Sequence, residues 1–142
     1  MPVADCLIDT NILLYAISTE PAEASKSAVA QNLLLTNRWA WSGQVAAEFV
    51  NASTSRKRCP PLSFSDAGQW LDCWTHFEMI PVNRAVVKIA LEIASRYMIS
   101  YYDAQVLAAA KLANCSTMYS EDLNHGQDYD GVRVINPFLA LP

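Results

Sequence analysis

Short apolar runs alternate with amphipathic stretches along this chain. The apolar run Val3–Ile8 fits a short buried strand, and further strands or extended segments are expected at 39–41, 77–82, 115–119 and 132–135. Between them, apolar residues recur at helical spacing, and we expect helices over 11–18, 21–35, 44–53, a stretch around 67–74 capped by Ser63 or Ser65, 86–97 and 100–113. This alternation predicts an α/β fold in which helices flank a mainly parallel sheet of about four to five short strands.

Composition and length are those of one ordinary globular domain. The chain has 142 residues, of which 52% are hydrophobic and 17% are charged, so it is not a disordered polyelectrolyte. We expect a single domain over residues 1–142. No apolar run approaches the roughly 18 residues of a membrane helix, and the first residues lack a basic signal-peptide segment. These observations predict a cytoplasmic protein whose four cysteines, without any C-x-x-C spacing, are reduced thiols.

Several chemistries are excluded by what the sequence lacks. Four glycines do not supply a nucleotide-binding loop, no G-x-S-x-G motif is present, and the two histidines lie far apart. The net charge of −4 is not that of an obvious nucleic-acid binder, because phosphate binding normally shows as a basic excess, but four acids gathered at one metal site would account for all of it. The remaining candidates for chemistry are carboxylates.

Two carboxylates follow predicted strands. Asp9 ends the first strand and Asp122 comes shortly after the strand near residue 119, so both are expected at the carboxyl edge of a parallel sheet, where such folds bind ligands. Each has a simpler explanation, because Asp9 suits a helix N-cap and Asp122 suits a turn. Glu121 competes with Asp122 for any functional role.

Two further carboxylates lie against the apolar faces of predicted helices. Glu48 lies at the edge of an apolar stripe, where its alternatives are to reach water or to pair with Arg38 or Arg56. Asp103 heads the apolar stripe of its helix, although Ser100 and Asp103 also have the spacing of a capping box. Four clustered acids repel one another unless protons or cations neutralise them.

Oxygen ligands without histidine or thiolate favour Mg²⁺ or Mn²⁺, and metal held by carboxylates at a sheet edge suits phosphodiester hydrolysis. Two alternatives stay open. A phosphatase of the D-x-D type needs a second aspartate where this chain has Asn11, and a non-catalytic binding module gains nothing from clustered repulsion.

Three segments resemble one known family. Leu7–Tyr15 is similar to the opening strand and turn of PIN-domain nucleases, Ser100–Ala110 to their third acidic motif and Met118–Leu123 to their fourth. The chain most resembles the VapC-type ribonuclease toxins of toxin–antitoxin pairs, from residue 3 to residue 137. The resemblance implies a PIN-like α/β/α sandwich with metal-dependent endoribonuclease activity.

The resemblance also implies residue roles and partners. Asp9 and Asp103 are expected to be the main metal ligands, with Glu48 and Asp122 completing the shell and helping to deprotonate the attacking water. The number of ions stays open. Homodimerisation and a small antitoxin partner are likewise implied. The supporting residues, which orient Asp9 or contact phosphate or water, are expected to be Thr10, Asn11 and Ser120.

Basic and aromatic residues give two further hypotheses. Arg56, Lys57 and Arg58 form the only basic run, which either contacts RNA phosphates at the edge of the cleft or is a solvated loop tip. The four tryptophans at 39, 41, 70 and 74 either belong to the core or line a face for a partner.

Overall fold

The computed structural model describes residues 4–141, so Val3, where the first strand was expected to begin, lies outside the described residues. One six-stranded sheet has the order β3-β2-β1-β4-β6-β5. All neighbouring strands are parallel except β5 and β6, which are antiparallel. The strands are β1 (Cys6–Ile8), β2 (Trp39–Ser42), β3 (Met79–Ile80), β4 (Thr117–Tyr119), β5 (Asp128–Tyr129) and β6 (Val132–Ile135).

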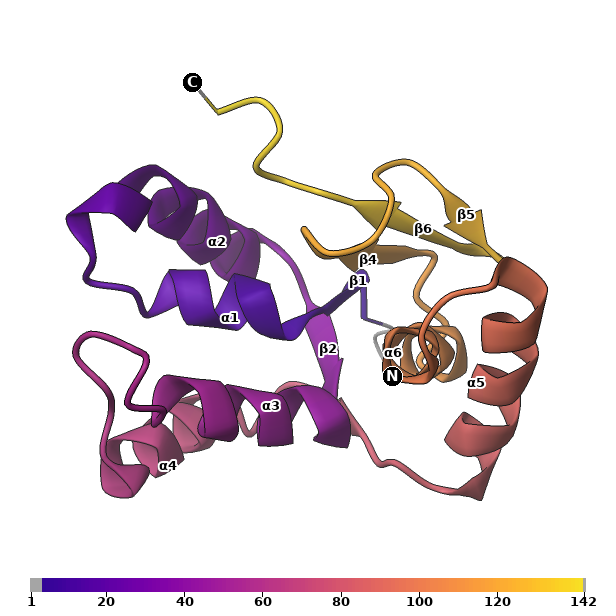
Figure 1. Cartoon of the computed structure of the whole chain (residues 1–142), viewed down its shortest axis with the longest axis horizontal. Coiled ribbons are helices and arrows are strands. Elements are labelled where there is room, and N and C mark those ends of the chain that lie inside the picture. Colours follow the sequence, from indigo (N-terminus) through magenta and orange to yellow (C-terminus); the bar gives the residue numbers. More distant parts are fainter. Residues whose placement is uncertain (1–3, 142) are drawn as a thin grey trace.

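Helices cover both faces of the sheet. Helix α6 packs against β1, β2, β4 and β6 and carries α5 on its outer side, whereas α1 contacts α2 and α3, and α3 contacts α4. Figure 1 shows α5 and α6 on one side of the strands and α1 to α4 on the other. The helices are α1 (Thr10–Ala16), α2 (Ala24–Thr36) after a 3₁₀ turn (Pro21–Glu23), α3 (Gly43–Ser53), α4 (Phe64–Cys73), α5 (Arg84–Tyr97) and α6 (Tyr101–Leu112). The predicted α/β fold with a mainly parallel sheet is confirmed.

Local signals in the sequence explain where the helices begin. The side chains of Ser42, Ser63, Asn83 and Ser100 each accept a hydrogen bond from the backbone N–H three residues later. Of the two serines that could cap α4, Ser63 is therefore the cap. A positive φ at Met98, 55°, ends α5 and lets the chain turn directly into α6.

A cluster of tryptophan side chains lies in the core. Trp39 and Trp41 are 1% exposed and Trp74 is 6% exposed, and their rings contact one another in edge-to-face geometry. Trp70 is 38% exposed on the outer side of α4. The prediction of core tryptophans therefore holds for three of the four, and one is left partly at the surface.

The sixth strand was not expected from the sequence. β5 has two residues and pairs with β6 across a tight turn at Asp130 and Gly131, whose φ values are 53° and 95°. Two successive positive φ angles are typical of a type I′ hairpin, which favours the pair Asp-Gly. Both edges of the sheet, β3 and β5, are two-residue strands.

Two further features of the described chain bear on the predictions. All four cysteines are free thiols, with Cys6 and Cys115 buried and Cys59 and Cys73 exposed. Across residues 4–141, no helix combines the length and the apolar character that crossing a membrane requires.

Candidate active site

Asp9 and Ser120 meet at the carboxyl edge of the sheet. They follow the last residues of β1 and β4, Ile8 and Tyr119, which are direct partners in the parallel register. The backbone N–H of Asp9 donates to the Tyr119 carbonyl at 3.1 Å. The Ser120 hydroxyl donates to Oδ2 of Asp9 at 2.7 Å. Strand pairing therefore brings together two residues that are 111 positions apart in the sequence.

Asp9 is both the cap of a helix and a member of this edge. Its Oδ1 accepts the backbone N–H of Thr10 at 2.8 Å, so the capping interpretation is correct. Oδ2 faces the neighbouring strand, so one carboxylate has both functions. The hydroxyl of Thr10 is buried and has no hydrogen-bond partner among the described residues. Buried hydroxyl groups in proteins usually have a hydrogen-bond partner. The unpaired Thr10 hydroxyl therefore indicates that the site around Asp9 can bind a further polar group.

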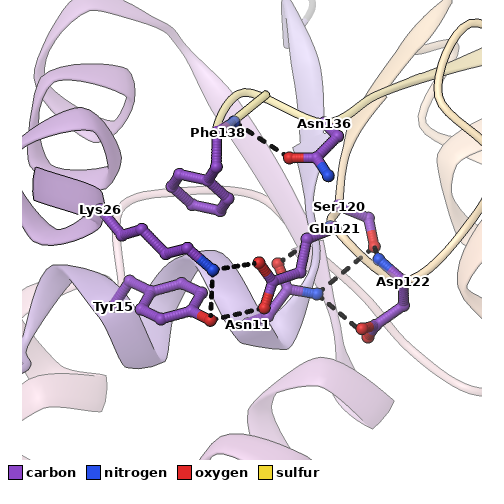
Figure 2. A network of polar contacts seen from close by, with 8 residues as sticks. All are labelled: Asn11, Tyr15, Lys26, Ser120, Glu121, Asp122, Asn136 and Phe138. Atoms are coloured by element: carbon purple, nitrogen blue, oxygen red, sulfur yellow. Dashed lines mark hydrogen bonds and ion pairs between the residues drawn. The ribbon is translucent and has the colours of Figure 1, made fainter. Parts of the chain in front are cut away.

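Asn11 connects three side chains of the edge. Its amide nitrogen lies 3.1 Å from Oδ2 of Asp122, 3.3 Å from the Ser120 hydroxyl and 3.5 Å from Oδ2 of Asp9. The Ser120 hydroxyl also accepts the backbone N–H of Asp122 at 3.1 Å. Figure 2 shows the contacts of Asn11 with Ser120 and Asp122. An amide donor between two carboxylates reduces their repulsion and fixes their positions.

Glu121 points away from this group. Tyr15 Oη donates to its carboxylate at 2.5 Å, and Lys26 Nζ pairs with it at 3.0 Å (Figure 2). Lys26 also lies over the rings of Tyr15 and Phe138, 4.8 Å and 5.4 Å from their centroids. Lys26 therefore neutralises the Glu121 carboxylate away from the sheet edge. Of the two adjacent carboxylates, the Asn11 amide contacts that of Asp122. Tyr15 and Lys26 hold this loop through contacts that no local sequence pattern predicts.

Glu48 and Asp103 approach from α3 and α6. Glu48 is exposed and takes part in none of the ion pairs found within residues 4–141. Arg38, one of its expected partners, pairs with Asp5 at 3.3 Å, so that alternative is wrong. The backbone N–H of Asp103 donates to the Ser100 hydroxyl at 3.2 Å, as the capping-box spacing predicts.

The charges of the four acids act on one another. Burial raises the pKa of Asp9 from 3.8 to about 6, against the hydrogen bonds from Ser120 and Thr10, and the charges of Asp122 and Glu48 raise it further. Although the Glu48 residue as a whole is exposed, partial desolvation of its carboxyl group raises its pKa, against a hydrogen bond from Gln44, and the charges of Asp103 and Asp122 raise it further. All four acids therefore belong to one electrostatic group, and their repulsion favours any cation that binds there.

The residues are suited to a hard metal ion with much of its coordination left to water. Within residues 4–141, no three His, Cys, Asp or Glu side chains lie close enough to hold one ion between them. The available donors are carboxylate, hydroxyl and amide oxygens, with Asp9 raised in pKa and the Thr10 hydroxyl unpaired. Mg²⁺ commonly binds to one or two carboxylates and retains several waters. This donor set therefore fits Mg²⁺ or Mn²⁺ held by few protein ligands.

One residue of the basic run, Arg58, borders the candidate site. Arg58 lines a hollow of about 250 Å³ together with Asn11, Tyr15, Glu23 and Glu121. Arg56 and Lys57 are exposed on the same loop. Arg58 therefore places a cation next to the amide that contacts Asp122.

A hollow of about 750 Å³ lies between α3, β3 and α6. Glu48 lies in its wall, so it adjoins the acidic group. The polar residues Gln44 and Gln105 and the apolar or aromatic residues Met79, Val82 and Tyr102 also line it.

Comparisons with known proteins identify the family and the fold of this chain. A family model described as "PIN domain" matches residues 6–127. Among curated proteins, none matches the sequence significantly. A toxin–antitoxin complex from Klebsiella pneumoniae is similar in structure, with 19% identity, 93% of this chain and 97% of that chain covered, and a TM-score of 0.65.

Two further solved structures are similar. VapBC2 from Rickettsia felis bound to promoter DNA has 21% identity, covers 92% of this chain and 97% of its own, and has a TM-score of 0.64. VapC20 from Mycobacterium tuberculosis, described as a toxin that cleaves the sarcin–ricin loop, has 17% identity, covers 82% and 91%, and has a TM-score of 0.66. At these identities the likeness concerns the fold.

Proposed function

Because the chain belongs to the PIN domain family, we propose that it is a metal-dependent endoribonuclease and the toxin of a type II toxin–antitoxin pair, acting in the cytoplasm. The observation that carries this proposal is the group of polar side chains at the carboxyl edge of β1 and β4. Asn11 contacts Asp9, Ser120 and Asp122 there; the charge of Glu48 acts on Asp9, and the charge of Asp103 acts on Glu48.

The four acids have distinct roles in the proposed reaction. Asp9 and Asp103 would hold Mg²⁺ or Mn²⁺, which would supply the positive charge that a phosphodiester needs to approach the carboxylates. The Thr10 N–H and the Ser120 hydroxyl fix both oxygens of Asp9. Glu48 and Asp122 complete the site and accept the proton of the attacking water.

Hydrolysis then proceeds by ordinary displacement at phosphorus. The water oxygen forms a bond to phosphorus, the bond from phosphorus to the leaving ribose oxygen breaks, and solvent protonates that oxygen. Asp122 is exposed and accepts a hydrogen bond from Asn11 through one oxygen, so its carboxylate is oriented but open to solvent. Glu48, whose pKa is raised, is suited to accept a proton.

RNA is the proposed substrate, and Arg58 is the basic residue best placed to bind an RNA phosphate. Arg58 borders the hollow that Asn11 also lines, so a phosphate next to the cleaved one can meet a positive charge there. The described cleavage activity of the similar VapC20 supports a nuclease.

The proposed partners are a small antitoxin and a second copy of this chain. The similar proteins from Klebsiella pneumoniae and Rickettsia felis are complexes of toxin and antitoxin, which supports the first. Copurification with the product of a neighbouring small reading frame tests the antitoxin, and light scattering on the purified chain tests the homodimer.

One experiment tests the activity. The purified protein is incubated with structured RNA and with a small phosphoester, with Mn²⁺ or with excess chelator, beside Asp9→Asn and Asp103→Asn. Asp72→Asn, an exposed acid on α4, is the matched control. We expect Mn²⁺-dependent RNA cleavage that both site variants lose and the control keeps. Cleavage that survives chelation or both site variants contradicts the mechanism, and cleavage of the small ester alone indicates a phosphatase.

A further inference from the structure

A chain of hydrogen-bonded side chains joins the two helices that carry Glu48 and Asp103. Tyr101 Oη donates to Oε1 of Gln105 at 2.8 Å. Gln105 Nε2 donates to Oε1 of Gln44 at 2.8 Å, which crosses from α6 to α3. Gln44 Nε2 donates to the backbone carbonyl of Tyr102 at 3.1 Å, which returns to α6. Gln105 is 6% exposed on an otherwise apolar helix face, so its amide has been buried with partners for both ends.

The direction of this chain is determined by its last acceptor. A backbone carbonyl accepts and never donates, so the amide nitrogen of Gln44 must face Tyr102. The oxygen of Gln44 then faces Gln105, which must donate through its nitrogen. The oxygen of Gln105 is left for the Tyr101 hydroxyl, which can donate. Each amide therefore has one orientation that satisfies every member.

Gln44 also lies beside Glu48, and both line the hollow between α3, β3 and α6. Gln44 and Glu48 are four residues apart in α3, so their side chains lie on one face of the helix. A hydrogen bond from Gln44 acts on the pKa of Glu48, lowering it against the effect of burial. If Gln44 turned its oxygen outward instead, two oxygens would face each other and the carboxylate would lose its donor.

We propose that Gln105 is a positioning residue that, through Gln44, holds the Glu48 carboxylate at a fixed place relative to Asp103. This inference rests on the proposed function, because it concerns the same acidic site. Separate variants can distinguish an effect of the Gln44 amide orientation from an effect on the packing of α3 against α6.

The test uses variants that remove hydrogen bonding while keeping volume. Gln105→Leu and Gln44→Leu break the chain in its middle, and Tyr101→Phe removes only the hydroxyl that donates to Gln105. Gln31→Leu is the control for an amide, since Gln31 makes two hydrogen bonds to Ala16 and Ser27 away from the acids. Tyr97→Phe is the control for a hydroxyl, since Tyr97 accepts the N–H of Asp130.

Two quantities are measured on the full chain. The first is RNA cleavage with kcat and KM separated, and the second is the Mn²⁺ concentration that gives half of the maximal rise in thermal stability, which needs no substrate. We expect Gln105→Leu and Gln44→Leu to lower kcat about tenfold and to raise the Mn²⁺ midpoint, with KM little changed. Tyr101→Phe shifts both quantities in the same direction by less, and the two controls leave both unchanged.

The double variant tests whether Gln44 and Gln105 act through one connected chain of hydrogen bonds or through two independent contacts. Gln44→Leu combined with Gln105→Leu should lower kcat no more than either change alone, because both break the same connection. A kcat loss equal to the product of the single losses overturns the proposal, as does a wild-type kcat and Mn²⁺ midpoint in Gln105→Leu. If the wild type cleaves no RNA, the proposed function fails, while the Mn²⁺ midpoints still decide whether Gln105 positions Glu48.

Discussion

Removing the charge of Asp9 should stabilise the metal-free protein at high pH. The pKa of this carboxyl is about 6 in the folded chain, because of burial, against an ordinary value of 3.8. The folded state therefore binds the proton more tightly than the unfolded state, and stability falls as pH rises from about 4 through 6. The full cost above pH 6 is about 3 kcal/mol, and about half of that is present at pH 5. The amide introduced by Asp9→Asn carries no charge, so that variant has no such cost.

The test depends on how the difference in free energy of unfolding between Asp9→Asn and wild type changes with pH. The new amide keeps an acceptor for the Thr10 N–H but alters the contact with Ser120, which costs about 1 kcal/mol at every pH. The free energy of unfolding of Asp9→Asn relative to wild type should therefore rise by about 1.5 kcal/mol between pH 5 and pH 8. Titrating groups far from Asp9 are common to both proteins and cancel in the comparison, whereas Glu48 and Asp122 interact with Asp9 and contribute to the measured difference.

Urea unfolding followed by tryptophan fluorescence measures this difference, since three of the tryptophans are buried. Chelator is present throughout, the protein concentration is held constant, and Asp72→Asn controls for losing one surface charge. A difference between Asp9→Asn and wild type that is the same at pH 5 and pH 8 would refute the argument that burial raises the pKa of Asp9. Added Mn²⁺ should stabilise the wild type more at pH 8 than at pH 5 and should leave Asp9→Asn nearly unchanged.

Three other changes test neighbouring features. Glu121→Gln removes the charge that pairs with the partly exposed Lys26, and we expect a loss of roughly 1 kcal/mol in urea unfolding with RNA cleavage reduced but present; complete loss of cleavage would instead give Glu121 a direct role. Replacing Arg56, Lys57 and Arg58 together by serine should weaken RNA binding and reduce the salt slope by about 2, as three lost phosphate contacts predict, whereas an unchanged slope would make the run a solvated loop. Trp74→Ala should cost about 3–5 kcal/mol because it opens the aromatic core, and thermal unfolding with a loss below about 1 kcal/mol would contradict that packing.

Much of the fold and the rough location of the acids follow from short-range patterns. The apolar run before Asp9 and the helical spacing before Tyr97 are properties of consecutive residues, so the sequence shows them directly. Asp9 and Asp122 were expected at one sheet edge because parallel strands end together, and the structure places both there. Their catalytic and metal-binding roles stay predictions.

Other features depend on contacts that no local pattern contains. Glu121 and Asp122 are adjacent in the sequence, and the difference between them comes from Lys26 and Tyr15, which lie 95 and 106 residues away. The buried amide of Gln105 likewise needs a partner 61 residues earlier, on another helix. The hairpin at Asp130 and Gly131 is different, because the Asp-Gly pair was a visible signal for it.

The two edges of the sheet restrict how this chain can associate. β3 and β5 each have only two residues. Edge strands this short do not support the extended strand pairing by which two sheets join edge to edge. β5 is also bent back by its tight turn, and the side chain of Asp130 in that turn is anchored by Arg96 and Lys111. Fibrillar growth through the sheet is therefore blocked at both sides, and any stable assembly of this protein has to form through side chains on its helices and loops.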